Sequence, residues 1–310
     1  MAERLWILPF KVAMSVTFFS VLFNILSDCD ETYNYWEPLH FISTWGNGSG
    51  FQTWEYSPSF ALRSYLYLWL FGWPSFISFL LGLPNWFAFL SVRILLGDLI
   101  RMKGLDVTKK RILFSFLFSL CYCVSPGYFL ASTTLLPSGP SSSLTALMLA
   151  FWLRRQYFWA VGCVAITGLV VWPFAAILGL PLAVYMIIDK KLNYLVKSSI
   201  LWALFLIPPL VIVDSFYFGR FVLAPLNIIR YNLFSHNNAS QLYGVEPSSF
   251  YIKNYILNQN LMCIFALLLS LLTIFKLKSV KTCNDKNQTS ISEVSLIVCM
   301  SLLLWNCIFF

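Results

Sequence analysis

Apolar segments recur along the whole of this 310-residue chain and constrain its fold more than any other feature. Short polar stretches separate them, and 59% of the residues are hydrophobic whereas only 11% are charged. A soluble domain of this size does not have such a composition. The sequence therefore predicts an all-α polytopic membrane protein. Its apolar segments are residues 7–26, 64–80, 84–100, 111–130, 141–153, 157–172, 175–188, 198–213, 257–275 and 291–310.

Lys and Arg fall in short clusters between these segments, and their alternation predicts the topology. Basic residues collect on the cytosolic side of membrane proteins, so the net charge of +8 fits this pattern better than nucleic-acid binding. If all segments crossed, the cluster 101–111 would fall on the side opposite to Arg4, whereas leaving out 64–80 puts every cluster on one side. We therefore expect about nine transmembrane helices, a cytosolic N-terminus and a segment 64–80 that lies in the membrane surface. Segments 141–153 and 175–188 are short for a span of ~20 residues.

An acidic stretch, Asp28 to Pro38, directly follows the first apolar segment. It holds four of the chain's 13 Asp and Glu residues, namely Asp28, Asp30, Glu31 and Glu37. Ionisable groups at a membrane boundary are costly and often mark a working site, although a solvated helix end is the plain alternative. Asp30 and Glu31 point about 100° apart on a helix. We therefore expect one of them to act as a general base and the other to orient or support it.

Two long segments, 27–83 and 214–256, fall on the predicted non-cytosolic side and are rich in Trp, Tyr, Asn, Glu and Arg. Aromatic faces and hydrogen-bonding side chains suit a sugar, and Arg suits a phosphate. For any single ring, an interfacial aromatic belt is the alternative. The candidate substrate-binding residues are Trp36, Glu37, Trp54, Glu55, Arg63, Asn227, Tyr231, Asn232 and Glu246.

A metal site is not expected. Asp28 and Asp30 form the D-x-D pattern that holds a metal ion and a nucleotide diphosphate in soluble glycosyltransferases, but no part of this chain has the βαβ pattern of their nucleotide-binding domain. The two histidines, His40 and His236, have no spacing for zinc. We therefore expect neither a metal nor a cofactor.

Glycosylation sequons and cysteines fit the predicted topology. Sequons at Asn47 and Asn238 lie on the predicted non-cytosolic segments, and a third at Asn287 lies in a basic loop predicted to be cytosolic. Of eight cysteines, Cys29 alone is expected to face the oxidising side, so no disulfide framework is expected.

Several motifs resemble those of one known family. Asp28–Pro38 is followed by Gly50–Pro58 and by Leu62-Arg63-Ser64-Tyr65. Later matching blocks are Gly168 to Pro181, Val213-Asp214-Ser215, Ala224 to Asn232 and Leu242 to Pro247. Together they resemble the dolichyl-phosphate-mannose-dependent mannosyltransferases of glycosyltransferase family 22. The nearest branch is the one that adds α-1,2-linked mannose to the N-glycan precursor in the endoplasmic reticulum.

The resemblance implies a GT-C fold, which we expect as a single transmembrane domain over residues 1–310. Its large first luminal loop, 27–83, would include surface helices and the catalytic acid, and 214–256 would form a second luminal loop. The implied reaction is an inverting, metal-independent transfer of mannose from dolichyl-phosphate-mannose to a dolichyl-diphosphate oligosaccharide at the endoplasmic reticulum membrane. The family's catalytic acid maps onto Asp30 or Glu31, and we favour Asp30 as the base.

The length of the chain and the competing functions both bear on the predicted activity. Family members continue well beyond this length with a luminal His-Lys-x-x-Arg-Phe-type motif, whereas the chain stops at Phe310 inside an apolar run. We therefore expect the C-terminal part of the family fold to be missing, and a truncated inactive homologue is one alternative. Another is a family member that forms α-1,6 linkages or acts on GPI anchors. A transporter would need charges within its spans, where Arg93 and Asp98 are the main ones, and the clustering of acids on one face disfavours it.

Overall fold

The structure is a computed structural model that describes residues 7–26, 28–46, 50–107, 126–234, 246–259 and 268. Within these ranges every regular element is a helix and there is no strand. The apolar segment 291–310, most of 111–130 and of 257–275, and the sequons at Asn47, Asn238 and Asn287 lie outside the described residues.

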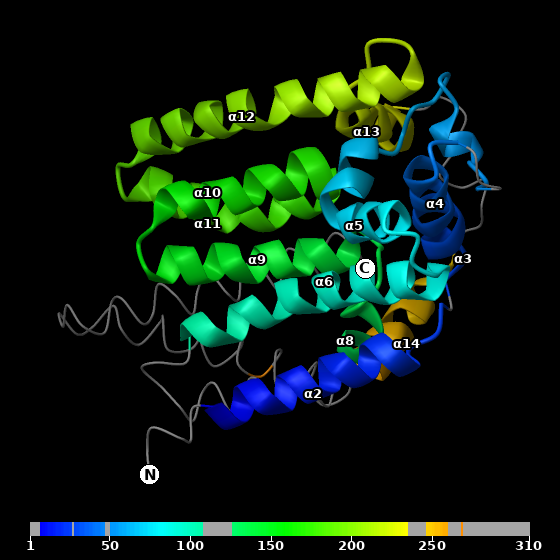
Figure 1. The fold of residues 1–310 in the computed structure, drawn as a ribbon. Helices are drawn as coiled ribbons and strands as arrows, with labels where there is room; N and C mark the ends of the chain where they lie inside the picture. The colour runs from blue at the N-terminus through cyan, green and yellow to red at the C-terminus, as the bar shows by residue number, and fades with distance from the viewer. Residues whose placement is uncertain are drawn as a thin grey trace.

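Six of the described helices lie side by side with nearly parallel axes and form a bundle (Figure 1). Each corresponds to a segment that the apolar pattern predicts, although several helices extend beyond the predicted bounds. The six are α2 (Ile7–Phe23), α6 (Asn85–Val107), α9 (Ser138–Leu153), α10 (Tyr157–Ile166), α11 (Leu180–Ile188) and α12 (Leu192–Phe218).

The first loop and its neighbours cover one end of this bundle, on the right in Figure 1. There lie α3 (Cys29–Glu31), a π-helical turn (Thr32–Trp36), α4 (Glu37–Ser43), α5 (Tyr65–Leu80) and α13 (Ala224–Phe234). A 3-10 turn (Trp54–Tyr56) belongs to the same loop. The short α8 (Pro126–Ala131) contacts both α2 and α14 (Ser248–Gln259).

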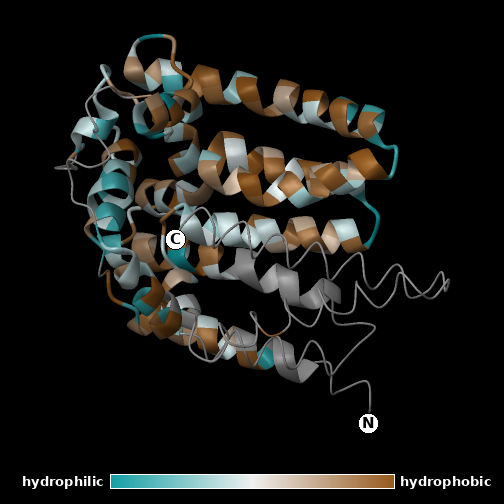
Figure 2. Ribbon diagram, turned by 180° about the vertical axis from the view of Figure 1, so that it is seen from behind, coloured by the Kyte–Doolittle hydropathy of each residue, from teal (hydrophilic) through white to brown (hydrophobic). Residues whose placement is uncertain are grey.

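Polar residues gather at the two ends of the bundle (Figure 2). The α9–α10 turn holds Arg154 and Arg155, and the α11–α12 turn holds Lys190 and Lys191. Both turns lie at the end opposite to α3 and α4 (Figure 1). Two basic turns therefore share one end, and the acidic stretch lies at the other.

Helices α10 and α11 form a hairpin whose tip reaches the acidic end. A π-helical turn (Thr167–Val171) closes α10, and a 3-10 helix (Pro173–Gly179) leads into α11. Between them Trp172 is extended, with φ −151° and ψ 106°, because the ring of Pro173 disfavours a helical conformation for the residue before it. The helical ladder is thus interrupted only at the tip of the hairpin.

Helix α12 is the one helix in the described part of the chain whose length and composition suffice to cross a membrane. It has 27 residues and a mean hydropathy of 2.0 in its most apolar window, of which 17% is buried. Phe205, Ile212 and Phe216 are at least two-thirds exposed. The helix presents this apolar face outward, as a lipid-facing helix does and a soluble core helix does not. The other apolar helices are shorter.

Among the described residues, the larger of two hydrophobic cores lies at the acidic end and joins the first loop to the bundle. It includes Tyr35 from the π-helical turn, Leu39 from α4, Tyr56 from the loop, Leu68 from α5 and Val92 from α6. This core fixes the loop against the bundle, and the candidate site is built on it.

Candidate active site

The acidic stretch folds into one continuous helical run, and Asp28 starts it. The Asp28 Oδ1 atom accepts a hydrogen bond from the backbone N–H of Asp30 at 2.8 Å, as a helix N-cap does. The next two carboxylates differ in exposure, since Asp30 is exposed and Glu31 is only 2% exposed. The two adjacent carboxylates therefore face different surroundings, as their angular separation on a helix requires.

Glu31 points into the protein and joins two elements. Its Oε1 atom accepts hydrogen bonds from the backbone N–H of Leu135 at 3.0 Å and from the indole N–H of Trp36 at 2.9 Å. Trp36 in turn packs its ring on Phe89 of α6, with the centroids 4.6 Å apart. Burial raises the pKa of Glu31, while the bonds from Leu135 and Trp36 and the charge of Arg93 oppose this rise. These contacts favour a supporting role for Glu31.

Asp30 lies on the open side of the same helical run. The side-chain amide of Asn34 donates to its Oδ1 atom at 3.4 Å. That amide is oriented by Thr53, whose hydroxyl donates to Asn34 Oδ1 at 2.7 Å. Partial burial raises the pKa of Asp30, the charge of Arg63 lowers it, and Asp28 and Glu55 raise it. Asp30 therefore combines solvent access with a nearby positive charge.

Arg63 brings Glu55 and Tyr35 together beside Asp30. Its Nε atom donates to Glu55 in an ion pair, and its Nη1 atom donates to the hydroxyl of the buried Tyr35 at 2.6 Å. In the described part of the chain, Nη2 of Arg63 makes no hydrogen bond. The guanidinium is thus fixed by two partners and retains donor capacity for a third.

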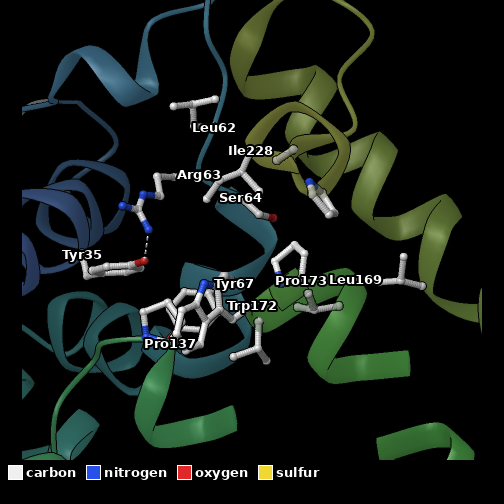
Figure 3. Close-up of a pocket in the computed structure, with 14 residues that line it drawn as sticks. Tyr35, Leu62, Arg63, Ser64, Tyr67, Pro137, Leu169, Trp172, Pro173 and Ile228 are labelled. Carbon is white, nitrogen blue, oxygen red and sulfur yellow. Dashed lines mark hydrogen bonds between the residues drawn. The ribbon is translucent and has the colours of Figure 1, made fainter. Parts of the chain in front are cut away.

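Arg63 also lines a pocket that is partly open to solvent, with an empty volume of roughly 410 Å³ when the solvent at its mouth is included. Figure 3 shows Arg63 and Tyr35 on one side, with Tyr67 and Trp172 facing them. The walls come from the first loop, the start of α5, the tip of the α10–α11 hairpin and the start of α13. Trp172 was not among the residues that the sequence singled out as a site, although its place before a proline at a break between apolar segments was a usable signal.

Two other candidates hold the first loop in shape. The Glu37 Oε2 atom accepts a hydrogen bond from the backbone N–H of Phe51 at 3.0 Å. The side-chain amide of Asn227 donates to the carbonyl of Ala61 at 3.1 Å. A role of these residues in substrate binding remains a prediction.

Three aromatic rings cluster outside the pocket. Trp54 lies 5.6 Å from Tyr231 and 5.1 Å from Phe60, measured between ring centroids. Asn232, next to Tyr231, donates to the carbonyl of Ile228 within α13 at 2.9 Å. Because Trp54 directly precedes Glu55, the cluster borders the ion pair with Arg63.

Glu246 and the D-x-D pattern complete the predicted set. Glu246 is exposed just before α14, a helix that contacts α8. Ligand atoms of Asp28, Cys29 and Asp30 lie within 4.8 Å of one another and are exposed. One oxygen of Asp28 is engaged as the helix cap, and a metal-independent site remains a prediction.

These features define the class of the protein, in its described part, as an all-helical bundle with one long apolar helix that faces outward and an acidic and basic site at one end. Residues 8–310 match the model of the Alg9-like mannosyltransferase family, and the chain belongs to this family.

Curated relatives agree with this assignment. The chain is 35% identical to the alpha-1,2-mannosyltransferase Alg9 of Drosophila melanogaster, over 97% of this chain and 48% of the relative. It is 41% identical to algn-9 of Caenorhabditis elegans, over 83% of this chain and 43% of the relative. It is 38% identical to the alpha-1,2-mannosyltransferase ALG9 of Homo sapiens, over 85% of this chain and 44% of the relative. The chain thus spans about half the length of the curated relatives it matches. No solved structure matches it.

Proposed function

We propose that the protein transfers mannose in α-1,2 linkage from dolichyl-phosphate-mannose to a dolichyl-diphosphate oligosaccharide, on the luminal side of the endoplasmic reticulum membrane. Family membership and the activity for which the relatives are named support a mannosyltransferase. The observation that carries the proposal is the exposed Asp30, which the charge of Arg63 influences, while Arg63 itself lines the pocket.

The proposed reaction uses Asp30 as the general base. An acceptor hydroxyl attacks the anomeric carbon of mannose, the bond from that carbon to the phosphate oxygen breaks, and the hydroxyl proton passes to Asp30. Lipid phosphate leaves as an anion, and Arg63 is the cation placed to stabilise it. The partial burial that raises the pKa of Asp30 also makes its carboxylate a stronger base.

Glu31 has a supporting role in this site. Its contacts with Leu135 and Trp36 hold the helical run that carries Asp30 against the bundle. Aromatic faces of Trp54 and Tyr231 are suited to stack on sugar rings of the acceptor.

The membrane arrangement belongs to the same proposal. A GT-C fold with about nine spans would place 27–83 and 214–256 in the lumen and the N-terminus in the cytosol. The two basic turns at one end of the bundle and the acidic stretch at the other support this orientation. The position of α5 at the acidic end, beside α4, supports its placement in the membrane surface.

The experiment is a transfer assay in microsomes that contain the protein, with radiolabelled dolichyl-phosphate-mannose and a dolichyl-diphosphate oligosaccharide acceptor. We expect a product whose new mannose is released by an α-1,2-specific mannosidase, and a strong loss of product in Asp30→Asn. Failure of the unaltered protein to transfer mannose would overturn the proposal in favour of an inactive homologue. A product resistant to that mannosidase would indicate a family member that forms α-1,6 linkages. Transfer only to a GPI precursor would indicate a family member that acts on GPI anchors.

A further inference from the structure

A fully buried carboxylate, Asp214, connects the last turns of α12 to the start of α5. Its Oδ1 atom accepts hydrogen bonds from the Ser64 hydroxyl at 3.0 Å, the Tyr65 N–H at 2.8 Å and the Leu66 N–H at 3.3 Å. The first N–H groups of a helix have no partner within the helix and need an external acceptor. For α5 this acceptor comes from a different helix, 149 residues after Tyr65.

The local residue at this helix start does not serve as the cap. Ser64 occupies the N-cap position, but its side chain makes no capping hydrogen bond and instead donates to Asp214. A serine hydroxyl is an adequate N-cap on its own. Burying a carboxylate costs far more than exposing a hydroxyl, and Asp214 Oδ2 is buried without a partner in the described part of the chain. The stability of α5 alone therefore does not explain why a carboxylate is buried at position 214.

The geometry around Asp214 offers another explanation. The preceding segment is tied to the same part of the chain at two further points. Asn227 donates to the carbonyl of Ala61 at 3.1 Å, and Arg220 donates to the carbonyl of Ser59 at 3.3 Å. The segment 59–66 is thus held against the end of α12 and the start of α13 by three separate contacts.

This segment contains one wall of the pocket. Leu62, Arg63 and Ser64 all line it, together with Pro225 and Ile228 of α13. Figure 3 draws this part of the lining. Ser64, which bonds directly to Asp214, follows Arg63 in the chain, so the contact with Asp214 fixes the backbone next to Arg63.

We propose that Asp214 is a positioning residue, which fixes the segment 59–66 on α12 and thereby sets the place of Arg63 in the pocket. The anchoring itself depends only on the structure, whereas its effect on mannose transfer rests on the proposed function. Asp214 contacts no reacting group in this proposal and acts through Ser64 and the start of α5.

The test compares Asp214→Leu, which removes the acceptor, with Asp214→Asn, which keeps a side-chain oxygen for Ser64 and Tyr65. Asp189→Leu is the matched control, because Asp189 is an exposed carboxylate paired with Lys191 at the opposite end of the bundle. Amide hydrogen exchange over residues 59–66 and the KM for dolichyl-phosphate-mannose are measured for each protein in membranes.

We expect faster exchange at Tyr65 and Leu66 in Asp214→Leu and a rise in the donor KM of roughly tenfold, because a small displacement of a binding group lowers rate and affinity strongly. Asp214→Asn should remain within about threefold of the unaltered protein, because the remaining acceptor oxygen preserves most of the contact. A variant that merely folds less well would lower the maximal rate and leave the KM of the folded fraction unchanged.

Unchanged exchange over 59–66 in Asp214→Leu overturns the anchoring role. Faster exchange with an unchanged donor KM overturns the effect on the pocket. If the unaltered protein transfers no mannose, the proposed function fails, and binding of dolichyl phosphate replaces the KM as the second readout. Equal binding by Asp214→Leu and the unaltered protein then overturns the inference.

Discussion

The carboxylate of Glu31 accepts a hydrogen bond from the backbone N–H of Leu135, a residue 104 positions later, at 3.0 Å. Leu135 is fully buried, and its carbonyl accepts the hydroxyl of Tyr67 at 2.8 Å. The chain around Leu135 is therefore fixed between the acidic stretch and α5. This ties Glu31 to the architecture and leaves Asp30, its neighbour, as the accessible carboxylate.

The first prediction separates the two acids. Asp30→Asn keeps the shape of the side chain and removes the base, so mannose transfer should fall by at least ~10²-fold with the protein level unchanged. Glu31→Gln keeps an oxygen for Leu135 and Trp36 and should retain most of the activity. The transfer assay in microsomes, normalised to protein amount, measures both. Loss of transfer in Glu31→Gln together with an active Asp30→Asn would reverse the two roles.

A third variant at these positions tests the structural role of Glu31. Glu31→Leu leaves the Leu135 N–H buried without an acceptor, which costs about 1–3 kcal/mol. The protein should therefore unfold at a lower temperature in detergent, while Glu31→Gln unfolds close to the unaltered protein. Equal melting temperatures for Glu31→Leu and Glu31→Gln would show that the hydrogen bond to Leu135 contributes nothing.

The pH dependence of transfer gives a second prediction. Asp30 must be deprotonated to act, and partial burial raises its pKa while Arg63 lowers it. The acidic limb of the pH–rate profile should therefore lie above the ordinary aspartate pKa of about 3.9. Arg63→Gln removes the lowering charge and should move the limb to higher pH, whereas Glu55→Gln removes a raising charge and should move it to lower pH. Shifts in the same direction would show that the limb does not report Asp30.

Much of the helical framework was predictable because the apolar segments are long, and a long apolar segment in lipid must satisfy its backbone hydrogen bonds internally, as a helix does. Segment 64–80 corresponds to α5 at Tyr65–Leu80, and 84–100 corresponds to the first two-thirds of α6. The basic residues in the turns after α9 and α11 also fall together at one end, as the alternation of charge indicated. These are local properties that the sequence carries directly.

The sequence predicts that Asp30 and Glu31 have different roles, but it does not predict which contacts assign those roles. Helical geometry required the two side chains to diverge, but the partner that captures Glu31 is Leu135, and nothing near Glu31 in the sequence identifies it. The same holds for Asp214, which matters through Ser64 and Tyr65 on a distant helix. Contacts of this kind depend on how helices pack, and a single sequence does not contain that information in readable form.

The aromatic cluster supplies a third prediction. If Trp54 stacks on the acceptor glycan, Trp54→Ala should raise the KM for the acceptor by roughly threefold to tenfold, and Trp54→Phe should retain most of the affinity. Trp159 on α10 is also exposed, at 51%, but lies near the basic end of the bundle. Trp159→Ala should therefore leave the acceptor KM unchanged. An unchanged KM in Trp54→Ala would favour a membrane-interface role for this ring.

Packing between α10 and α12 gives a fourth prediction. A Cβ atom added at Gly162 would meet the indole ring of Trp202 at 2.4 Å, well inside contact distance. Gly162→Ala should therefore destabilise the protein by about 1–3 kcal/mol, measured by thermal unfolding in detergent. In a Trp202→Leu background the same substitution should cost much less. Additive effects of the two changes would show that the cost at Gly162 does not come from the contact with Trp202.

The last prediction concerns the side of the membrane that carries the site. Cys29 is exposed within the acidic stretch, and Lys190 lies in the turn at the other end of the bundle. In a protein whose other cysteines are replaced by alanine, a membrane-impermeant maleimide added to sealed microsomes should not reach Cys29. The substituted residue in Lys190→Cys should react under the same conditions. Permeabilising the microsomes should expose Cys29 as well, because the bilayer is the only barrier.

Reaction of Cys29 in sealed microsomes would place the acidic end in the cytosol and contradict the proposed orientation. Reaction of both positions there would show that the bundle does not separate them across the membrane.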